Sequence, residues 1–300
     1  MFTRKTGAAA VSILSNTFLI GIKLVAGMVT GSISLIAEAI HSLMDLAAAV
    51  IAYFSVRIAD KPADEKHPFG HGKAENISGV VEGVLIFIAA GIIINEAVHR
   101  LIKRSNLEMV EIGIGIMAVS IVINVFVSRF LLRVARNTDS LALEADAYHL
   151  TTDVMTMAGV LAGLIIVRIT GLMILDPIIA ILVAILIIRA AYQIVRKSFG
   201  GLMDLRLPEA EESAIRSTIT EHSHQLVGFH ELRTRKAGSH RHIALHLVMP
   251  RDASVQDAHE VCDHLEQHIE EKLKSAKVTI HIEPCTIECS DCSASCSLRQ

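Results

Sequence analysis

The sequence predicts an α-helical membrane protein with six transmembrane helices, followed by a small α+β domain in the order αββαβ, of the ferredoxin-like or metallochaperone-like type. Hydrophobic residues make up 52% of the 300 residues and the mean hydropathy is +0.49, which is too apolar for an ordinary soluble domain. The apolar residues concentrate before about Leu205. We therefore expect a membrane domain over 1–204, a soluble domain over 205–284 and a cysteine-rich tail over 285–300.

Six apolar segments are long enough to cross a bilayer, which takes ~20 residues of helix. The first is expected to be a retained membrane helix, because no signal-peptidase site follows a short apolar core. The predicted segments are Gly7–Val29, Ser32–Val56, Asn76–Val98, Val110–Phe130, Ser140–Ile169 and Asp176–Arg196.

The basic residues between these segments predict their orientation, because cytoplasmic loops carry an excess of Lys and Arg. Four basic groups fall on one side of the membrane, against one group on the other side. The majority side carries Arg4, Lys5, Arg57, Lys61, Lys66, Lys73, Arg129, Arg133, Arg136, Arg196 and Lys197. Both termini are therefore expected in the cytoplasm, and the second and fifth helices should run antiparallel.

One short motif occurs twice, once in the second helix and once in the fifth. Residues 37–45 read A-E-A-x-H-x-x-x-D, and residues 145–153 read A-D-A-x-H-x-x-x-D. On a helix, positions i and i+4 share a face, so His41 lies beside Asp45, and His149 lies beside Asp153. Two such helices facing one another would supply two nitrogens and two oxygens, which suits a tetrahedral site for a divalent metal.

Hydrogen bonding between helices is the alternative explanation for polar residues near the middle of a membrane. Charged residues at mid-membrane cost ~2.5–3.5 kcal/mol each, and helix contacts alone explain two matched His/Asp pairs poorly. Glu38 and Asp146 lie one turn before the two histidines. Two interpretations of Glu38 and Asp146 are open. They either support the metal site or relay protons to it, or they only form polar contacts between helices.

The loop between the second and third helices contains Asp64, His67 and His71 within eight residues, among two prolines and two glycines. These three side chains predict a metal site in the loop; the alternative is a solvated turn. The tail contains four cysteines in the pattern C-x3-C-x2-C-x3-C, namely Cys285, Cys289, Cys292 and Cys296. Two interpretations of this segment are open: the four thiols bind Zn²⁺ or a soft metal, or they belong to a tail without fixed structure.

The soluble domain begins after Gly200-Gly201, where the composition changes. We expect helices near Glu209–His222 and Val255–Lys274, and strands near His230–Arg235, His242–Met249 and Val278–Glu283. This order suits a small open sheet with both helices on one face. The domain is rich in histidine, and the pattern alone does not choose among its histidines.

Taken together, these features resemble the cation diffusion facilitator family of divalent metal/proton antiporters. The resemblance rests on six helices, the two H-x-x-x-D motifs, the D-x-x-H-P-F-G-H-G-K loop over 64–73 and the αββαβ domain. It implies a homodimer in a lipid bilayer that exports Zn²⁺ from the cytoplasm, driven by protons. It also implies that His41, Asp45, His149 and Asp153 form the transport site.

The resemblance implies further sites in the loop and in the soluble domain. The loop site maps onto Asp64, His67 and His71, and a charge interlock between subunits maps onto Lys73 and Asp204. A binuclear metal site of the cytoplasmic domain maps onto His230, His246, His259, His281 and Glu283, where Glu283 stands at a position that is aspartate in well-studied bacterial members. That domain is expected to dimerise and to sense metal.

The histidine at position 41 points to the preferred ion, because many bacterial members carry aspartate there. A site of two His and two Asp resembles the zinc-selective branch, and imidazole favours Zn²⁺ over Mn²⁺. By the same logic Cd²⁺ and Co²⁺ are also candidate substrates, and Fe²⁺ is left open.

Three other classes of function are alternatives to the antiporter. A membrane-anchored metal sensor is the main alternative, although it has no need of a site at mid-membrane. A channel conflicts with a closed four-ligand cage, and no nucleophile–base pair or cofactor loop predicts an enzyme. The net charge of −3 indicates no nucleic-acid partner. The lack of a long His-rich loop favours a bacterial or archaeal plasma membrane.

Overall fold

The computed structural model describes residues 4–30, 33–103, 111–170, 172, 174–223 and 225–285. At residues 30, 33–38, 40–41, 100, 103, 111–113, 164, 167–168 and 176 only the backbone is described. The chain divides into two compact units, Met1–Phe199 and Gly200–Gln300, and each is described by itself.

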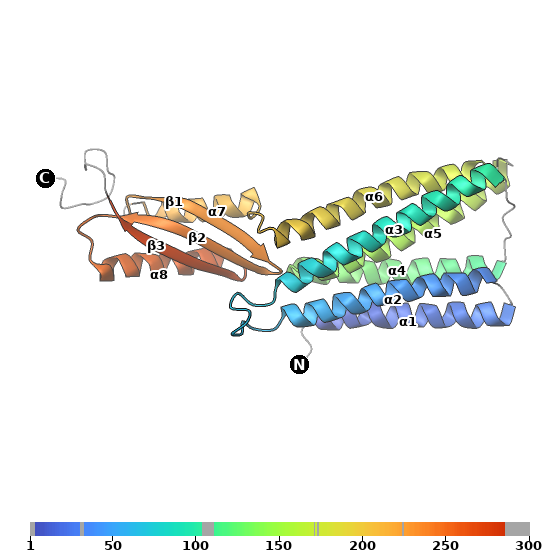
Figure 1. The fold of residues 1–300 in the computed structure, drawn as a ribbon, viewed down its shortest axis with the longest axis horizontal. Helices are drawn as coiled ribbons and strands as arrows, with labels where there is room; N and C mark the ends of the chain where they lie inside the picture. Colours follow the sequence, from blue (N-terminus) through green and yellow to red (C-terminus); the bar gives the residue numbers. More distant parts are fainter. Residues whose placement is uncertain are drawn as a thin grey trace. The chain divides into compact units, whose positions relative to one another are not determined.

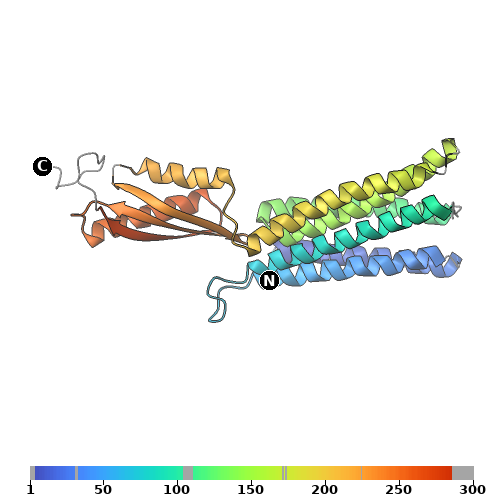
Figure 2. The same ribbon diagram turned by 45° about the horizontal axis from the view of Figure 1, so that its top comes forward.

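The first unit is a bundle of six long helices that run side by side (Figures 1 and 2). The helices match the six predicted segments, and the predicted starts at Ser32 and Val110 lie outside the described residues. Their bounds are α1 Arg4–Thr30, α2 Ile33–Ala59, α3 Lys73–Lys103, α4 Glu111–Thr138, α5 Leu141–Thr170 and α6 Leu175–Leu202.

Among the described residues, five of the helices contain a stretch long and apolar enough to cross a membrane. The remaining helix is α5, whose first half carries Glu144, Asp146 and Asp153. Asp146 and His149 are buried inside the bundle. Burial against other helices is the expected position for polar groups of a membrane helix.

Small residues allow α5 to lie at the centre of the bundle. This helix packs against α2, α3 and α4, and its Ala145 and Ala147 are buried in clusters with residues of other helices. Small side chains let helix backbones approach closely in a membrane. Large side chains such as Phe126 and Leu182 are exposed on the outside, where lipid would contact them. The packing therefore brings the polar residues of α5 to the interior.

A buried ionic contact joins three helices at the end of the bundle where α1, α3 and α5 begin. Glu75 on α3 is fully buried and accepts hydrogen bonds from Lys5 Nζ at 3.0 Å and from Ser140 Oγ at 2.6 Å. Charge-assisted hydrogen bonds of this kind are about twice as strong as neutral ones. Glu75 thus fixes α1 and the start of α5 relative to α3.

The second unit is a three-stranded sheet with two helices, in the predicted order αββαβ. The strands lie in the order β1-β2-β3; β1 and β2 are antiparallel, and β2 and β3 are parallel. The bounds are α7 Glu209–Glu221, β1 Gly228–Ala237, β2 His240–Met249, α8 Val255–Lys272 and β3 Ala276–Pro284. The predicted fold class is confirmed for both units.

The two faces of this sheet differ in character. Ile243, Leu245 and Leu247 alternate along β2 and are buried in one core with Ile219 of α7 and Leu265 of α8. Successive side chains of a strand point to opposite faces. The intervening positions of β2, including His246, therefore belong to the face away from the helices.

Candidate functional site

The two H-x-x-x-D helices meet inside the bundle, where α2 packs against α5. His149 Nε2 lies 3.2 Å from Asp45 Oδ1, and both residues are buried. Asp45, His149 and Asp153 each offer a ligand atom within 4.8 Å of the other two. The backbone of His41 lies on α2 one turn before Asp45, and its side chain lies outside the described part. The structure thus brings three of the four predicted ligands together.

Two further carboxylates are buried beside these ligands. Glu82 of α3 is fully buried, and its Oε1 accepts a hydrogen bond from Ser78 Oγ at 3.0 Å. Asp146 of α5 is 1% exposed, and both carboxylates interact electrostatically with His149. Glu82 Oε2, Asp146 Oδ2 and His149 Nδ1 are buried without a hydrogen-bond partner. The surroundings of the site are therefore acidic and suit a cation.

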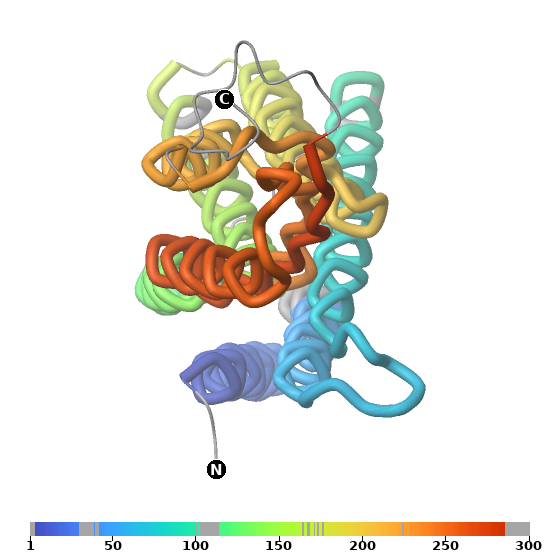
Figure 3. Tube along the Cα trace, turned by 90° about the vertical axis from the view of Figure 1, so that its left-hand side faces the viewer, coloured from blue at the N-terminus to red at the C-terminus, as the bar shows by residue number. Residues whose placement is uncertain are grey.

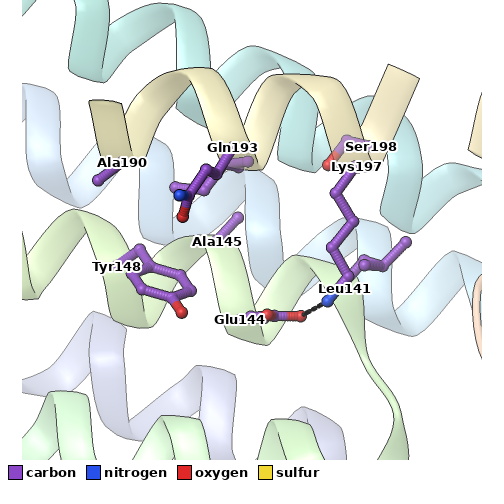
Figure 4. Close-up of a pocket in the computed structure, with 9 residues that line it drawn as sticks. Leu141, Glu144, Ala145, Tyr148, Ala190, Gln193, Lys197 and Ser198 are labelled. Carbon is purple, nitrogen blue, oxygen red and sulfur yellow. Dashed lines mark hydrogen bonds and ion pairs between the residues drawn. The ribbon is translucent and has the colours of Figure 1, made fainter. Parts of the chain in front are cut away.

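The start of α5 is held against α6 by an exposed ion pair. Lys197 Nζ lies 2.5 Å from Glu144 Oε2, at the edge of a small pocket between the two helices (Figure 4). Tyr148 and Gln193 also line this pocket. No predicted metal ligand with a described side chain lines it.

The α2–α3 loop lies at the edge of the bundle (Figure 3). It holds its three candidate ligands together. Asp64 Oδ1 lies 3.0 Å from His67 Nδ1, and Asp64 Oδ2 lies 3.3 Å from His71 Nε2. The backbone N–H of His67 also donates to Asp64 Oδ1 at 2.7 Å, which lowers the pKa of the Asp64 carboxyl. These three ligand atoms lie within 4.8 Å of one another. An ionised carboxylate and two imidazoles fit a zinc-type ion.

A row of histidines crosses the sheet of the second unit. His246 on β2 pairs with His230 on β1 and with His281 on β3, so the three side chains share the face away from the helices. Glu283 lies among them, with its oxygens 2.8 Å from His246 Nδ1 and 3.0 Å from His230 Nε2. The hydrogen bond from His246 is the main cause that lowers the pKa of Glu283. His230, His246 and Glu283 form a second compact ligand group.

Glu231 is a neighbour of this group that the sequence pattern did not reveal. The pairing of β1 with β2 shifts between His230 and Arg233, and Glu231 has a φ of 51° at this β-bulge. The bulge places Glu231 Oε2 3.7 Å from His246 Nε2. Bulges often redirect a side chain towards a site, but an ordinary glutamate in a strand gives no sign of one.

His259 is placed apart from this group within one chain. It lies on α8, 72% exposed by its side chain, with Nε2 3.5 Å from Asp263 Oδ2. Lys73 begins α3, while Asp204 lies in the other unit and accepts a hydrogen bond from Arg235 at 3.1 Å. Their predicted interlock between subunits stays a prediction.

Only the first cysteine of the tail is described. Cys285 is buried, and its backbone N–H donates to Met249 O at 2.9 Å. Cys289, Cys292 and Cys296 lie outside the described residues. The predicted tail site therefore stays a prediction.

The comparison with protein families covers nearly the whole chain. Residues 9–203 match the cation efflux transmembrane domain, and residues 207–285 match the cytoplasmic domain of cation efflux proteins. A long helical bundle with buried His and Asp side chains, followed by this α+β domain, is typical of a multi-pass membrane transporter of metal cations. The chain belongs to the cation efflux family, the cation diffusion facilitators. Members of this family are transporters, and this protein is a transporter, not an enzyme.

Two relatives that align with nearly the whole chain agree with this assignment. The chain is 38% identical over 276 residues to the uncharacterized transporter sll1263 of Synechocystis, covering 92% of this chain and 89% of the relative. It is 32% identical over 280 residues to the cation-efflux pump FieF of Salmonella newport, covering 93% and 92%. The metal-bound C-terminal domain of the CzcD transporter from Thermotoga maritima is 21% identical, with 27% of this chain and 98% of that one covered and a TM-score of 0.25.

Proposed function

We propose that the protein exports Zn²⁺ from the cytoplasm in exchange for protons, through a site made by His41, Asp45, His149 and Asp153. The observation that carries this proposal is the 3.2 Å approach of His149 to Asp45 between α2 and α5, with Asp153 in the same group. Imidazole and carboxylate ligands in a set of four suit Zn²⁺, and Cd²⁺, Co²⁺ and Fe²⁺ are secondary substrates. A relative named as a cation-efflux pump supports the direction.

Exchange with protons follows from the chemistry of these ligands. Imidazole and carboxylate must both be deprotonated to bind a metal, so protons and Zn²⁺ compete for the same atoms. An unperturbed imidazole has a pKa of about 6.5, which allows this exchange near neutral pH. Protonation on the outer side would release Zn²⁺, and the empty site would return carrying protons.

The remaining sites have supporting roles in this proposal. Asp64, His67 and His71 hold a metal at the end of the bundle, and His230, His246, His281 and Glu283 hold a metal on the sheet. Zn²⁺ on the sheet senses cytoplasmic zinc and stabilises a homodimer, in which His259, placed apart from the sheet group within one chain, would reach the metal from the second subunit. The protein spans the plasma membrane with both termini inside, and Lys73 and Asp204 join the two subunits.

The test is Zn²⁺ flux in proteoliposomes with an imposed pH gradient. Asp45→Asn and Asp153→Asn should each lower gradient-driven flux by at least ~10–100-fold, because each removes a charged ligand. His99→Ala, which removes an exposed imidazole at the far part of α3, is the control and should transport normally. Unchanged flux in both Asp variants would contradict the site, and flux that ignores the pH gradient would contradict proton exchange.

A further inference from the structure

Three histidines outside all of these sites come together where α7 meets α8. His222 follows the last turn of α7, while His264 and His268 lie one turn apart on α8. The ring centroids of His222 and His268 are 5.1 Å apart, and those of His264 and His268 are 6.4 Å apart. We refer to His222, His264 and His268 as the helix histidines.

The hydrogen bond of the His222 ring gives it the tautomer and the orientation that a metal ligand needs. Its Nδ1 lies 2.9 Å from the carbonyl oxygen of Thr218. A carbonyl only accepts hydrogen bonds, so Nδ1 carries the proton and Nε2 keeps a lone pair. Metal-binding histidines usually have this arrangement, in which the second ring nitrogen donates to a carbonyl or carboxylate. The hydrogen bond also fixes the orientation of the ring at the end of α7.

The two histidines of α8 complete the ligand set from the other helix. Positions 264 and 268 share one face because they are four residues apart. Leu265 and Ile269 are buried in the core and fix the rotation of α8, which leaves His264 and His268 exposed. Exposed side chains change rotamer within nanoseconds, so the rings of His264 and His268 can turn towards an ion beside His222.

The ends of the two helices are already held together next to these rings. Lys272 Nζ lies 3.1 Å from Glu221 Oε2, one residue before His222 and one turn after His268. An ion pair and a shared core therefore join α7 and α8 independently of the helix histidines.

We propose that His222, His264 and His268 form a binding site for a divalent transition-metal ion that bridges α7 and α8. Three imidazoles favour Zn²⁺, Ni²⁺ or Cu²⁺ over Mg²⁺ and Ca²⁺, which prefer oxygen. A water molecule would fill the fourth position around Zn²⁺. This site lies on the helices, whereas the row of His230, His246 and His281 lies on the opposite face of the sheet. It does not depend on the transport function proposed above.

The test is residue-resolved modification of histidines by diethyl pyrocarbonate, on the full-length protein in detergent micelles. Zn²⁺ should protect all three helix histidines over one concentration range, and Mg²⁺ at the same concentration should protect none. His268→Ala should remove the protection of His222 and His264. His240→Ala, which removes an exposed imidazole at the start of β2, should leave the protection unchanged.

Two outcomes would overturn the proposal: equal modification of the helix histidines with and without Zn²⁺, or protection that persists in His268→Ala. Far-UV circular dichroism of His268→Ala without metal should match the unsubstituted protein, which excludes misfolding as the cause of lost protection. Asp45→Asn with Asp153→Asn should leave protection of the helix histidines intact. Failure of the transport site is thereby distinguished from failure of this site.

Discussion

His149 Nε2 and Asp45 Oδ1 lie 3.2 Å apart although 104 residues separate them in the chain. If both bind one ion, their effects on Zn²⁺ affinity must be coupled, because each ligand depends on the other to hold the metal. We expect Asp45→Asn and His149→Gln each to weaken Zn²⁺ uptake into proteoliposomes by at least ~10–100-fold, the loss typical of even outer-shell changes. The double variant should lose much less than the product of the two.

The matched control for this cycle pairs Asp45→Asn with Asp64→Asn in the α2–α3 loop. Asp64 belongs to a different ligand group. The fold-losses of the two single variants should therefore multiply in the double variant. A multiplicative result for Asp45 with His149 would show that the two residues do not share an ion.

The helices and the αββαβ order of elements along the chain could be predicted because their signals are local. An apolar run of ~20 residues and a strand with alternating burial, such as 243–247, are visible in the sequence itself. The pairing of His149 with Asp45 could also be expected, since the motif repeats and the topology makes its two helices antiparallel.

Contacts that no sequence repeat or residue spacing encodes could not be predicted. The approach of His222 to His268 depends on how α7 and α8 pack, which no local pattern encodes. Glu231 reaches His246 through a β-bulge formed by a residue with positive φ, and glutamate is not a residue type that marks such a position. The same limit applies to the contact of Glu75 with Lys5 and Ser140.

Glu75→Ala should destabilise the bundle strongly. The substitution leaves Lys5, which is 11% exposed by its side chain, without its closest carboxylate, and removes the acceptor of Ser140 Oγ. Breaking a buried pair by removing one partner costs about 3–5 kcal/mol. The measurement is thermal unfolding in detergent micelles, followed by circular dichroism.

Glu144→Ala is the comparison for this loss, because Glu144 forms an ion pair with Lys197 that is largely exposed. Exposed pairs contribute about 0–1 kcal/mol, so its unfolding temperature should change little. Equal shifts for Glu75→Ala and Glu144→Ala would contradict the structural role assigned to Glu75.

Gly83→Ala should weaken the packing of α3 against α6. A Cβ at position 83 would overlap Val195 Cγ2, whereas a Cβ at Gly91, two turns further along α3, would meet nothing within 4 Å. Overpacking costs about 1–3 kcal/mol. Gly91→Ala makes the same chemical change in open space and should be neutral or slightly stabilising. The two unfolding temperatures, measured side by side, give the result; a Gly83→Ala protein as stable as Gly91→Ala would contradict this contact.

Cys262 should react slowly with iodoacetamide, because only the thiolate is nucleophilic. Burial in the core of the second unit, with smaller effects of Glu266 and Asp263, raises the pKa of the Cys262 thiol from 9.0 to about 11. A thiol loses its proton as the pH rises, so the raised pKa moves the onset of reaction upwards by about two units. At pH 8 the thiolate fraction is then about 100-fold smaller than that of an ordinary cysteine.

The rate at Cys262 can be followed by mass spectrometry between pH 7 and 10 in the folded protein, and after unfolding as the reference. In the folded protein the rate should still be rising near pH 10, whereas in the unfolded chain it should level off above the ordinary pKa of the thiol. Glu266→Gln removes one negative neighbour and should move the folded profile towards lower pH. A folded profile that levels off near pH 9 would mean that burial does not suppress ionisation of this thiol.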